Sequence, residues 1–310
     1  MIETIPRSSS IAPSSTTNVV AIENLSRTYG DKVALNQVSL TIPKGCVYGL
    51  IGGNGAGKTT LLKHVTGMLA PQTGIVKVFG LDPTKEPVEV LGNIGFLSEE
   101  RDLPNWMSIQ ELLRYTQAFY PTWDRELARD LVCMFELDLK AKVRTQSRGQ
   151  RARVGLLIAV AHRPQLLVLD EPSSGLDPVV RRDVLNAIIR TVADEGRTVL
   201  FSSHLLDEID RVADRIAMLS NGKIVLEDEI DQMKSSFQRF TLRYASTPKG
   251  PPNLPGLIDA ELTGTEWVCT CRVSDDQEQY NFARSSGAQV IEKSVLSLED
   301  IFVINSKSRV

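Results

Sequence analysis

The sequence predicts an α/β fold built on a parallel sheet that helices cover on both faces. Short apolar segments typical of buried strands alternate with helical segments over most of the chain, an order typical of parallel sheets. A glycine-rich turn links one of these strands to the next helix. From about Arg239 the character changes, and strands precede short helices. We therefore expect an α/β core with a helical insertion subdomain and a small C-terminal α+β appendage.

The composition is that of a globular chain without a broad attraction for polyanions. The 310 residues are 42% hydrophobic and 24% charged, with a formal net charge of -3, so nucleic acid is not an expected partner. No segment approaches the ~20 apolar residues of a membrane-spanning helix, and we expect a cytoplasmic protein. The Ser-, Thr- and Pro-rich stretch Pro6 to Thr17 predicts a disordered lead over residues 1–18.

The cysteines indicate reduced thiols rather than a disulfide framework. They are scattered among apolar neighbours, at Cys46, Cys133, Cys269 and Cys271. Cys269 and Cys271 alternate on a predicted strand and so share one face, but a metal pair needs further ligands, and none is evident nearby.

The elements in the first third of the chain follow from alternation and from apolar runs. Strands are expected at Val19–Asn24, Val38–Ile42, Val47–Ile51, Ile75–Phe79 and Asn93–Leu97. A helix follows the glycine-rich turn and is expected to end at about Leu69.

A helical insertion is expected over about 100–160. Ser108 with Glu111 forms a capping box ahead of one helix, and Thr122 is expected to cap a second from Trp123 to about Leu137. The core then continues with a buried helix at Val154–Ala161, a strand at Leu166–Asp170, a helix at Val179–Ala193 and a strand at Thr198–Ser202.

The C-terminal appendage is predicted to mix strands and helices. Its expected elements are strands at Arg239–Tyr244 and Trp267–Val273, separated by the Pro- and Gly-rich stretch Thr247–Gly256, and a helix at Asp275–Ser286 closed by Gly287. Ser297 and Asp300 are expected to cap a last short helix. The predicted division is a core domain over 19–238 and an appendage over 239–310.

The most informative segment reads GGNGAGKTT and lies directly between an apolar strand and a helix. The backbone N–H groups of such a turn point inward, and the helix start adds the positive end of its dipole, which together bind phosphate. Lys58 is expected to reach the outer phosphates, and the Thr59 hydroxyl to ligate Mg²⁺. An ordinary turn would not need a lysine followed by two threonines. The candidate phosphate ligands are Gly52, Gly53, Asn54, Gly55, Ala56, Gly57, Lys58, Thr59 and Thr60.

Two carboxylates end the apolar strand in the segment LLVLDEP. A carboxylate at such a strand end, beside a phosphate loop, is placed to hold Mg²⁺ or its water shell, and we assign this role to Asp170. Glu171 is then placed to polarise the water that attacks the terminal phosphate. Without the phosphate loop, a solvated turn or a helix cap would be the better interpretation.

Two further candidates lie at element ends. Ser147 and Gly149, in the segment SRGQ that ends at Gln150, precede a helix and form either a second anion site or a plain helix cap. His204 follows a strand at its carboxyl end, where ligands of open α/β sheets bind. A lone histidine is more often structural, but this location favours a place near the terminal phosphate.

The sequence leaves the roles of Tyr29 and Asp177 open. The ring of Tyr29 is suited to stack on an adenine, but a half-buried tyrosine at a strand end gives the same pattern. Asp177 follows the carboxylate pair in the segment SGLD and either binds ligand or caps the helix that begins near Pro178.

The order of these motifs closely resembles the ATP-binding subunit of ABC transporters. In the family's terms GGNGAGKTT is Walker A, SRGQ the signature, LLVLDEP Walker B, SGLD the D-loop and His204 the switch histidine. The resemblance covers about Val19 to Glu227 and implies a P-loop NTPase fold of the ABC ATPase type. It also implies an ATPase that uses ATP and Mg²⁺, with Tyr29 at the adenine-stacking position.

The resemblance implies two kinds of partner. In the family, the signature of one subunit closes over ATP on the Walker A loop of another. Ser147 and Gly149, with Gln150 beside them, would therefore act in trans in a homodimer, or in a heterodimer with a related ATPase subunit. Closure would drive an integral-membrane permease between inward- and outward-facing states, with this chain peripheral on the cytoplasmic face of the cell membrane.

Several positions depart from the family pattern. Gln146 and Arg148 replace the leucine and the middle glycine of the usual LSGGQ signature, and Gly53 replaces a common proline. Glu99 stands where a glutamine is usual. An ionised glutamate still accepts a hydrogen bond from Mg²⁺-bound water, so Glu99 is kept as a catalytic and metal-site candidate, although it cannot donate.

Two function classes remain. The segment Glu99-Glu100-Arg101 and the ending Leu298–Phe302 look like the branch that pairs with ABC-2 type permeases, often exporters. The loop Leu97–Trp106 would then receive a short cytoplasmic helix of the permease. The alternative is a soluble ABC ATPase that acts on ribosomes or DNA. Relatives of that kind carry long coiled-coil insertions or two cassettes in one chain, and here the insertion is compact and the cassette single.

Overall fold

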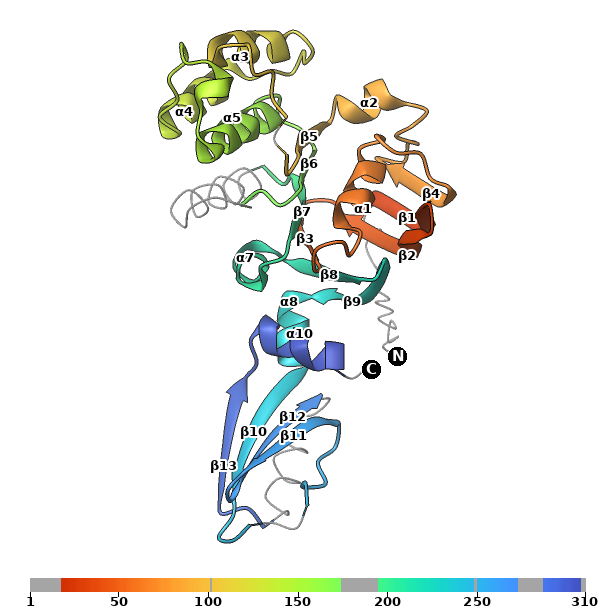
Figure 1. Ribbon diagram of the computed structural model, residues 1–310, viewed down its shortest axis with the longest axis vertical. Helices are drawn as coiled ribbons and strands as arrows, with labels where there is room; N and C mark the ends of the chain where they lie inside the picture. The colour runs from red at the N-terminus through yellow and green to blue at the C-terminus, as the bar shows by residue number, and fades with distance from the viewer. Residues whose placement is uncertain (1–17, 101, 174–194, 248–249, 273–286, 308–310) are drawn as a thin grey trace, which may run out of the picture.

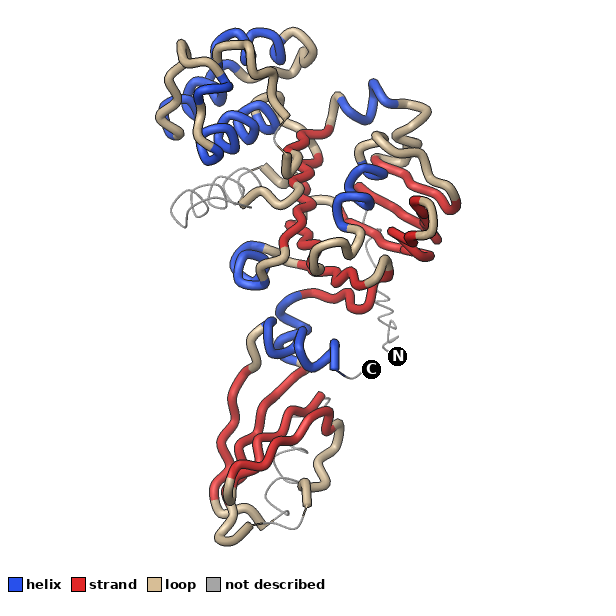
Figure 2. Tube along the Cα trace, in the orientation of Figure 1, coloured by secondary structure: helices blue, strands red, loops and turns tan. Residues whose placement is uncertain are grey.

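Three β-sheets organise the chain in a computed structural model that describes residues 18–100, 102–173, 195–247, 250–272 and 287–307. Figure 1 shows a helical group at one end of the long axis, a central region with two of the sheets, and the third sheet at the other end. The same view coloured by secondary structure shows the strands of the six-stranded sheet one below another in the middle of the picture, with the strands of the three-stranded sheet beside them (Figure 2). Across the described helices, no span is both long and apolar enough to traverse a bilayer.

The central sheet carries the strands that the sequence predicted as buried. The strands of the sheet in spatial order are β5 (Ile94–Leu97), β6 (Leu166–Leu169), β7 (Thr198–Ser203), β3 (Val47–Ile51), β8 (Arg215–Ser220) and β9 (Lys223–Glu229). β8 and β9 were not predicted from the sequence. The first five are parallel, and β9 pairs antiparallel with β8. Every residue of β3, β6 and β7 is buried, as expected for strands covered on both faces. The predicted parallel sheet is confirmed, with one antiparallel strand added at its edge.

A second, antiparallel sheet was not predicted as a separate unit. It is formed by β1 (Asn18–Tyr29), β2 (Lys32–Pro43) and β4 (Thr73–Val78), in the order β2-β1-β4. Only Gly30 and Asp31 separate β1 from β2. A two-residue connection returns the chain directly and so permits only an antiparallel pair.

The helix after the phosphate loop, α1 (Lys58–Val65), is shorter than predicted. Thr66 caps it, and Gly67 has a φ of 71°, so the backbone turns left-handed before Leu69. Glycine adopts this conformation without the cost that a Cβ imposes, and it is a usual helix terminator. Another short helix, α2 (Pro87–Leu91), precedes β5.

The helical insertion contains α3 (Ile109–Gln117), α4 (Arg125–Met134) and α5 (Arg148–Val160), with a 3₁₀ turn at Val143–Thr145. The predicted capping box of Ser108 and Glu111 is confirmed. α5 begins six residues earlier than the predicted buried helix at Val154, because Ser147 caps it.

The predicted cap of α4 is wrong. Asp124 is the N-cap, and its carboxylate accepts hydrogen bonds from the backbone N–H groups of Glu126 and Leu127. Thr122 instead donates its hydroxyl to the carbonyl of His162. A carboxylate two residues further on displaces the threonine because it accepts two N–H groups and complements the helix dipole.

Two hydrophobic clusters cover the central sheet. One joins residues of the sheet to the insertion helices and to α7 (Leu206–Val212), with Leu157, Phe201 and Ile209 among its fully buried side chains. The other fills the space between the sheet, α1 and the second sheet, with Leu61 and Leu200 among its buried side chains. This packing fixes the ends of β3, β6 and β7 relative to α1.

The third sheet has the order β11-β12-β10-β13 and is antiparallel. Its strands are β10 (Phe237–Arg243), β11 (Leu257–Thr263), β12 (Glu266–Arg272) and β13 (Val290–Val295), and it lies between α8 (Ile230–Ser235) and α10 (Leu298–Lys307) in the chain. The sequence predicted β10 and β12 but missed the two edge strands. Cys269 and Cys271 are both buried in the small cluster of this sheet. The predicted helices Val179–Ala193 and Asp275–Ser286 lie outside the described residues.

The last helix returns to the central region. Leu298 and Ile301 of α10 belong to the same hydrophobic cluster as Ile209 of α7 and Met233 of α8, and Figure 1 shows α10 beside α8. Ser297 and Asp300 make the predicted cap, with the serine hydroxyl accepting from the Asp300 N–H at 3.1 Å. The third sheet thus has a hydrophobic core of its own, whereas α10 packs into the core of the central region. The division at 238/239 stays a prediction.

Candidate active site

The predicted phosphate loop runs from Gly52 to Gly57, between the last residue of β3 and the first of α1. Gly57 is the N-cap of α1 and has a φ of 110°. A Cβ at this position would clash with the carbonyl oxygen of Ala34 on β2. Only glycine therefore lets the helix start this close to the neighbouring sheet, and this contact fixes the direction in which α1 presents its first N–H groups.

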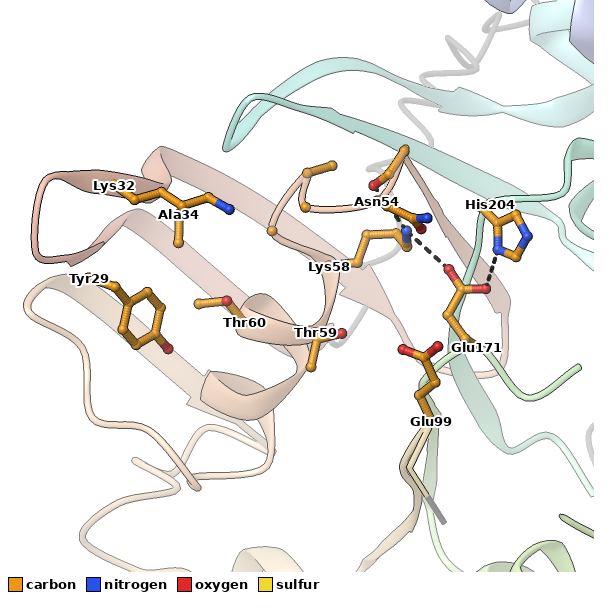
Figure 3. A pocket seen from close by; sticks show the side chains of 14 residues that line it. Tyr29, Lys32, Ala34, Asn54, Lys58, Thr59, Thr60, Glu99, Glu171 and His204 are labelled. Carbon is orange, nitrogen blue, oxygen red and sulfur yellow. Dashed lines mark hydrogen bonds and ion pairs between the residues drawn. The ribbon is translucent and has the colours of Figure 1, made fainter. Parts of the chain in front are cut away.

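The loop lines one wall of a cavity of about 660 Å³ (Figure 3). Residues from the β1–β2 hairpin, the loop, the start of α1 and the segments that follow β5, β6 and β7 surround it. They are Tyr29, Lys32, Ala34, Gly53, Asn54, Gly55, Ala56, Gly57, Lys58, Thr59, Thr60, Glu99, Glu171 and His204. The structure thus brings together twelve of the predicted site residues and adds two, Lys32 and Ala34.

The side chain of Lys58 lines this cavity and is held in place by a hydrogen bond and an ion pair. Its Nζ donates to the carbonyl oxygen of Gly52 at 2.6 Å and forms an ion pair with Glu171 Oε1 at 3.0 Å. Both side chains are buried. A buried cation at the start of a helix, beside a glycine-rich loop, is suited to bind the outer phosphates of a nucleotide.

Glu171 bridges this lysine to His204. Its second oxygen, Oε2, lies 2.7 Å from His204 Nδ1. Glu171 has a left-handed backbone conformation, with a φ of 45°, which is uncommon outside glycine and typical of functional turns. The Glu171 N–H donates to Ser202 Oγ at 2.9 Å, and this hydroxyl donates to Asp170 Oδ1 at 2.7 Å. Figure 3 shows Lys58 and His204 on opposite sides of the Glu171 carboxylate.

Oxygen ligands gather next to this ion pair. Thr59, Glu99 and Asp170 all line a neighbouring cavity of about 450 Å³, and Thr59 and Glu99 line the first cavity as well. In the described residues, no group of three or more His, Cys, Asp or Glu side chains is placed to hold a metal by itself. One hydroxyl and two carboxylates nevertheless match the protein share of a Mg²⁺ site whose other ligands are phosphate oxygens and water.

Tyr29 lies at the far rim of the first cavity, at the end of β1. The Arg27 guanidinium carbon lies 5.0 Å from the centroid of its ring, and the residue is 46% exposed. Lys32, three residues on, extends back toward the loop, with its Nζ 3.8 Å from where a Cβ on Gly55 would lie. The rim therefore combines an aromatic surface with a cation.

The chain is similar to known ATP-binding proteins. The sequence pattern of the ABC transporter family matches residues 35–174. SrtF of Streptococcus pyogenes, a lantibiotic transport ATP-binding protein, is 35% identical over 215 residues, which are 69% of this chain and 92% of SrtF. This chain belongs to the ABC transporter ATP-binding subunits. It binds ATP, hydrolyses it and powers transport.

Two further comparisons extend the match. YtrB of Bacillus subtilis (strain 168), an ABC transporter ATP-binding protein, is 28% identical over 288 residues, or 92% of this chain and 97% of YtrB. A solved structure of an ATP binding subunit of an ABC transporter superposes with a TM-score of 0.65 at 27% identity, over 70% of this chain and 92% of the other. The ABC ATPase fold predicted from the motifs is confirmed.

The signature segment of this ABC subunit does not line the cavity around Lys58. Ser147 caps α5, with its hydroxyl accepting from the Gln150 N–H and the Gln150 side chain accepting from the Ser147 N–H. Neither these two residues nor Gly149 is among the described residues that line the cavity around Lys58. The helix-cap interpretation is thus confirmed for Ser147, and a second role toward phosphate stays a prediction. Asp177 lies outside the described residues.

The sequence offered little to identify the two added residues. Lys32 and Ala34 lie on β2, directly after the hairpin turn that follows Tyr29. The only feature of the sequence that could have indicated them is this hairpin. Because Tyr29 lies at the rim of the cavity, the strand that follows the hairpin turn must begin beside the cavity. Antiparallel pairing sets Tyr29 opposite Lys32, and Ala34 then falls on the same side as Lys32, because side chains alternate along a strand.

Proposed function

We propose that the cavity around Lys58 is where this ABC subunit binds and hydrolyses ATP. The observation that supports this most directly is the buried chain from Lys58 through Glu171 to His204, beside a glycine loop at a helix start. Lys58 and the loop N–H groups would hold the phosphates. The base would stack on Tyr29 and the ribose would lie near Lys32 and Ala34.

Glu171 is proposed as the group that polarises the attacking water. Its carboxylate is buried and lies between a cation and an imidazole, and its backbone turn aims the side chain into the cavity. His204, with a side chain 43% exposed, would contact the terminal phosphate from beside Glu171, to which its Nδ1 is hydrogen-bonded at 2.7 Å. The water would then lie next to Glu171 and attack the terminal phosphorus in line with the leaving oxygen.

Thr59, Asp170 and Glu99 are proposed to hold Mg²⁺. Bound there, the ion supplies positive charge to the phosphate oxygens. Asp170 is held in place by the Ser202 hydroxyl at 2.7 Å, which leaves its second oxygen for a ligand. Glu99, on the loop after β5, would accept hydrogen bonds from metal-bound water.

A dimer is proposed to complete the site. Ser147 is exposed at the start of α5, and Gly149 is half-exposed. Both are available to a second subunit, either another copy or a related ATPase. In such a pair, Ser147, Gly149 and Gln150 would contact the nucleotide held by the partner's loop.

An integral-membrane permease is proposed as the second partner, with this subunit on the cytoplasmic face of the membrane. The 450 Å³ cavity is lined by apolar side chains from the loop that follows β5 and from its neighbours, namely Met68, Phe96, Leu97, Leu103 and Ile158. Its other side includes Glu99, so a helix bound here would touch the proposed metal site. We infer export as the direction from the ABC-2 resemblance of the sequence.

Glu171→Gln tests the central assignment. The amide keeps the size of the side chain but cannot take a proton, so we expect ATP binding to persist and turnover to fall by a factor of roughly 10² or more. ATP-bound dimer should accumulate, as measured by light scattering on a size-exclusion column. Full turnover in this variant would refute the role of Glu171. Purification of the subunit from native membranes in detergent, followed by identification of the co-purified integral protein, tests the partner.

A further inference from the structure

Glu208 connects the two segments that carry Glu171 and His204. It lies on α7 and is only 3% exposed. Its Oε1 accepts a hydrogen bond from Ser173 Oγ at 2.5 Å, and its Oε2 accepts one from Ser203 Oγ at 2.7 Å. Both serines are themselves buried. One carboxylate thus joins the segment after β6 to the end of β7.

The two serines stand next to the site residues in the chain. Ser173 follows Glu171 by two positions, and Ser203 immediately precedes His204. Ser203 Oγ also accepts a hydrogen bond from the Leu205 N–H at 3.0 Å, which closes the turn around His204. The backbone on both sides of His204 is therefore fixed through the hydroxyl that Glu208 holds.

Both site residues depend on such support. The His204 side chain is 43% exposed, so packing does little to hold its ring. Glu171 has a left-handed φ of 45°, a conformation that persists only where the surroundings enforce it. The contact between them, 2.7 Å from His204 Nδ1 to Glu171 Oε2, requires the two segments to keep their separation.

A carboxylate is an expensive way to fill a buried position, because burying a charge costs several kcal/mol. α7 packs in the large hydrophobic cluster through its neighbour Ile209, so a purely structural need at position 208 could be met by an apolar side chain. The carboxylate gives what an apolar residue cannot, namely two directed acceptors aimed at two separate loops.

We propose that Glu208 is a positioning residue for ATP hydrolysis, which sets the distance between Glu171 and His204 by holding Ser173 and Ser203. The proposal rests on the roles assigned above to Glu171 and His204. It places α7 in the catalytic apparatus, although Glu208 itself lies outside the residues that line the nucleotide cavity.

The test measures kcat and KM for ATP in the full chain with Glu208→Leu, which removes both acceptors at similar volume. We expect kcat to fall by roughly a hundredfold, the effect of misplacing a reacting group by ~1 Å, with KM unchanged within about twofold because Lys58 and the loop are untouched. Glu208→Gln keeps hydrogen-bonding atoms at both serines and should recover most of kcat. Glu227→Leu is the control. Glu227 also accepts a hydrogen bond from a side-chain hydroxyl, that of Tyr48 at 2.7 Å, but it is not among the described residues that line the cavity. The kcat of this variant should match that of the parent.

Two results would overturn the proposal: an unchanged kcat in Glu208→Leu, or a rise in KM in proportion to the loss of kcat, which would mark general disruption. If Glu208→Leu does not fold, Ser203→Ala removes one of the two bonds and should lower kcat with KM unchanged, and an unchanged kcat there also refutes the role. If instead the roles assigned to Glu171 and His204 in ATP hydrolysis are wrong, Glu171→Gln and His204→Ala would retain turnover. This outcome is distinct from a failure of the role of Glu208.

Discussion

The Nζ of Lys58 lies 3.0 Å from Oε1 of Glu171, in a buried ion pair. The group proposed to hold phosphate and the group proposed to activate water are therefore direct partners. A triphosphate that binds Lys58 competes with this carboxylate for the same cation. Binding of substrate and release of Glu171 toward water are thus expected to be one event.

Lys58→Ala is expected to weaken ATP binding by roughly tenfold to a hundredfold, the range of a lost charge-assisted contact. It also leaves Glu171 without its cation, so we expect a loss of unfolding free energy of about 3 kcal/mol. Isothermal titration calorimetry and urea unfolding measure the two effects. Lys77→Ala, on an exposed position of β4, is the control and should change neither. Unaltered ATP affinity in Lys58→Ala would count against the phosphate role.

Tyr29→Ala distinguishes the two interpretations that the sequence left open. If the ring stacks on adenine, its loss should raise the Kd for ATP by about fivefold to tenfold, near 1 kcal/mol, while Tyr29→Trp should bind as well as the parent. Affinity for inorganic triphosphate should not change, because it has no base. If Tyr29→Ala weakens both ligands equally or neither, Tyr29 is a structural residue of the strand end.

Gly57→Ala is expected to distort the phosphate loop. The residue has a φ of 110°, and a Cβ would meet the Ala34 carbonyl, so we expect a loss of stability of roughly 2 kcal/mol and loss of ATP binding. Gly53→Ala is the matched control within the same loop, since a Cβ there meets nothing within 4 Å. Thermal unfolding and nucleotide titration of the two variants should separate them clearly. Equal behaviour would show that the close approach at Gly57 is not required.

Stability is expected to decline in mild acid because of His162. Its ring stacks on Tyr120 at 3.9 Å between centroids, and burial lowers the pKa of its imidazole. The unfolded chain, with a histidine pKa of about 6.5, then binds the proton more readily than the folded protein does. The contribution of neutral His162 to the free energy of unfolding is therefore complete above about pH 6.5. Below that pH the free energy of unfolding falls as the pH decreases.

His162→Phe should flatten this decline between about pH 7 and pH 5, as measured by urea unfolding at several pH values. The phenyl ring preserves the stack on Tyr120 but does not titrate. His64, whose pKa burial also lowers, accounts for a remaining slope. A slope identical to that of the parent would rule out His162 as a cause.

Local patterns were enough to predict most of the candidate site. Lys58 and Thr59 follow a glycine turn between two strongly apolar elements, and Asp170 and Glu171 directly end a buried strand. Each signal is contained in fewer than ten consecutive residues. The topology then brings them together because parallel strands end at one edge.

Features that depend on distant contacts were not predicted. Glu208 reaches Ser173 across 35 positions, and nothing in its own neighbourhood indicates a buried carboxylate. The edge strand β13 has a polar centre, Glu292 to Ser294, so neither alternation nor an apolar run reveals it. β11 does alternate apolar and polar residues from Ile258 to Thr263, but it directly follows the Pro- and Gly-rich stretch, and this short signal was missed. The cap of α4 was misplaced because Thr122 and Asp124 are both good caps, and the local sequence does not show that the Thr122 hydroxyl donates to the distant carbonyl of His162.

The third sheet is attached to the rest of the protein at two points. The chain enters it through α8 and leaves it through α10, and both helices pack in the cluster that contains Ile209 of α7. A unit anchored at entry and exit cannot swing about a single hinge. A load applied to that sheet is shared between two helices and reaches the helix that carries Glu208.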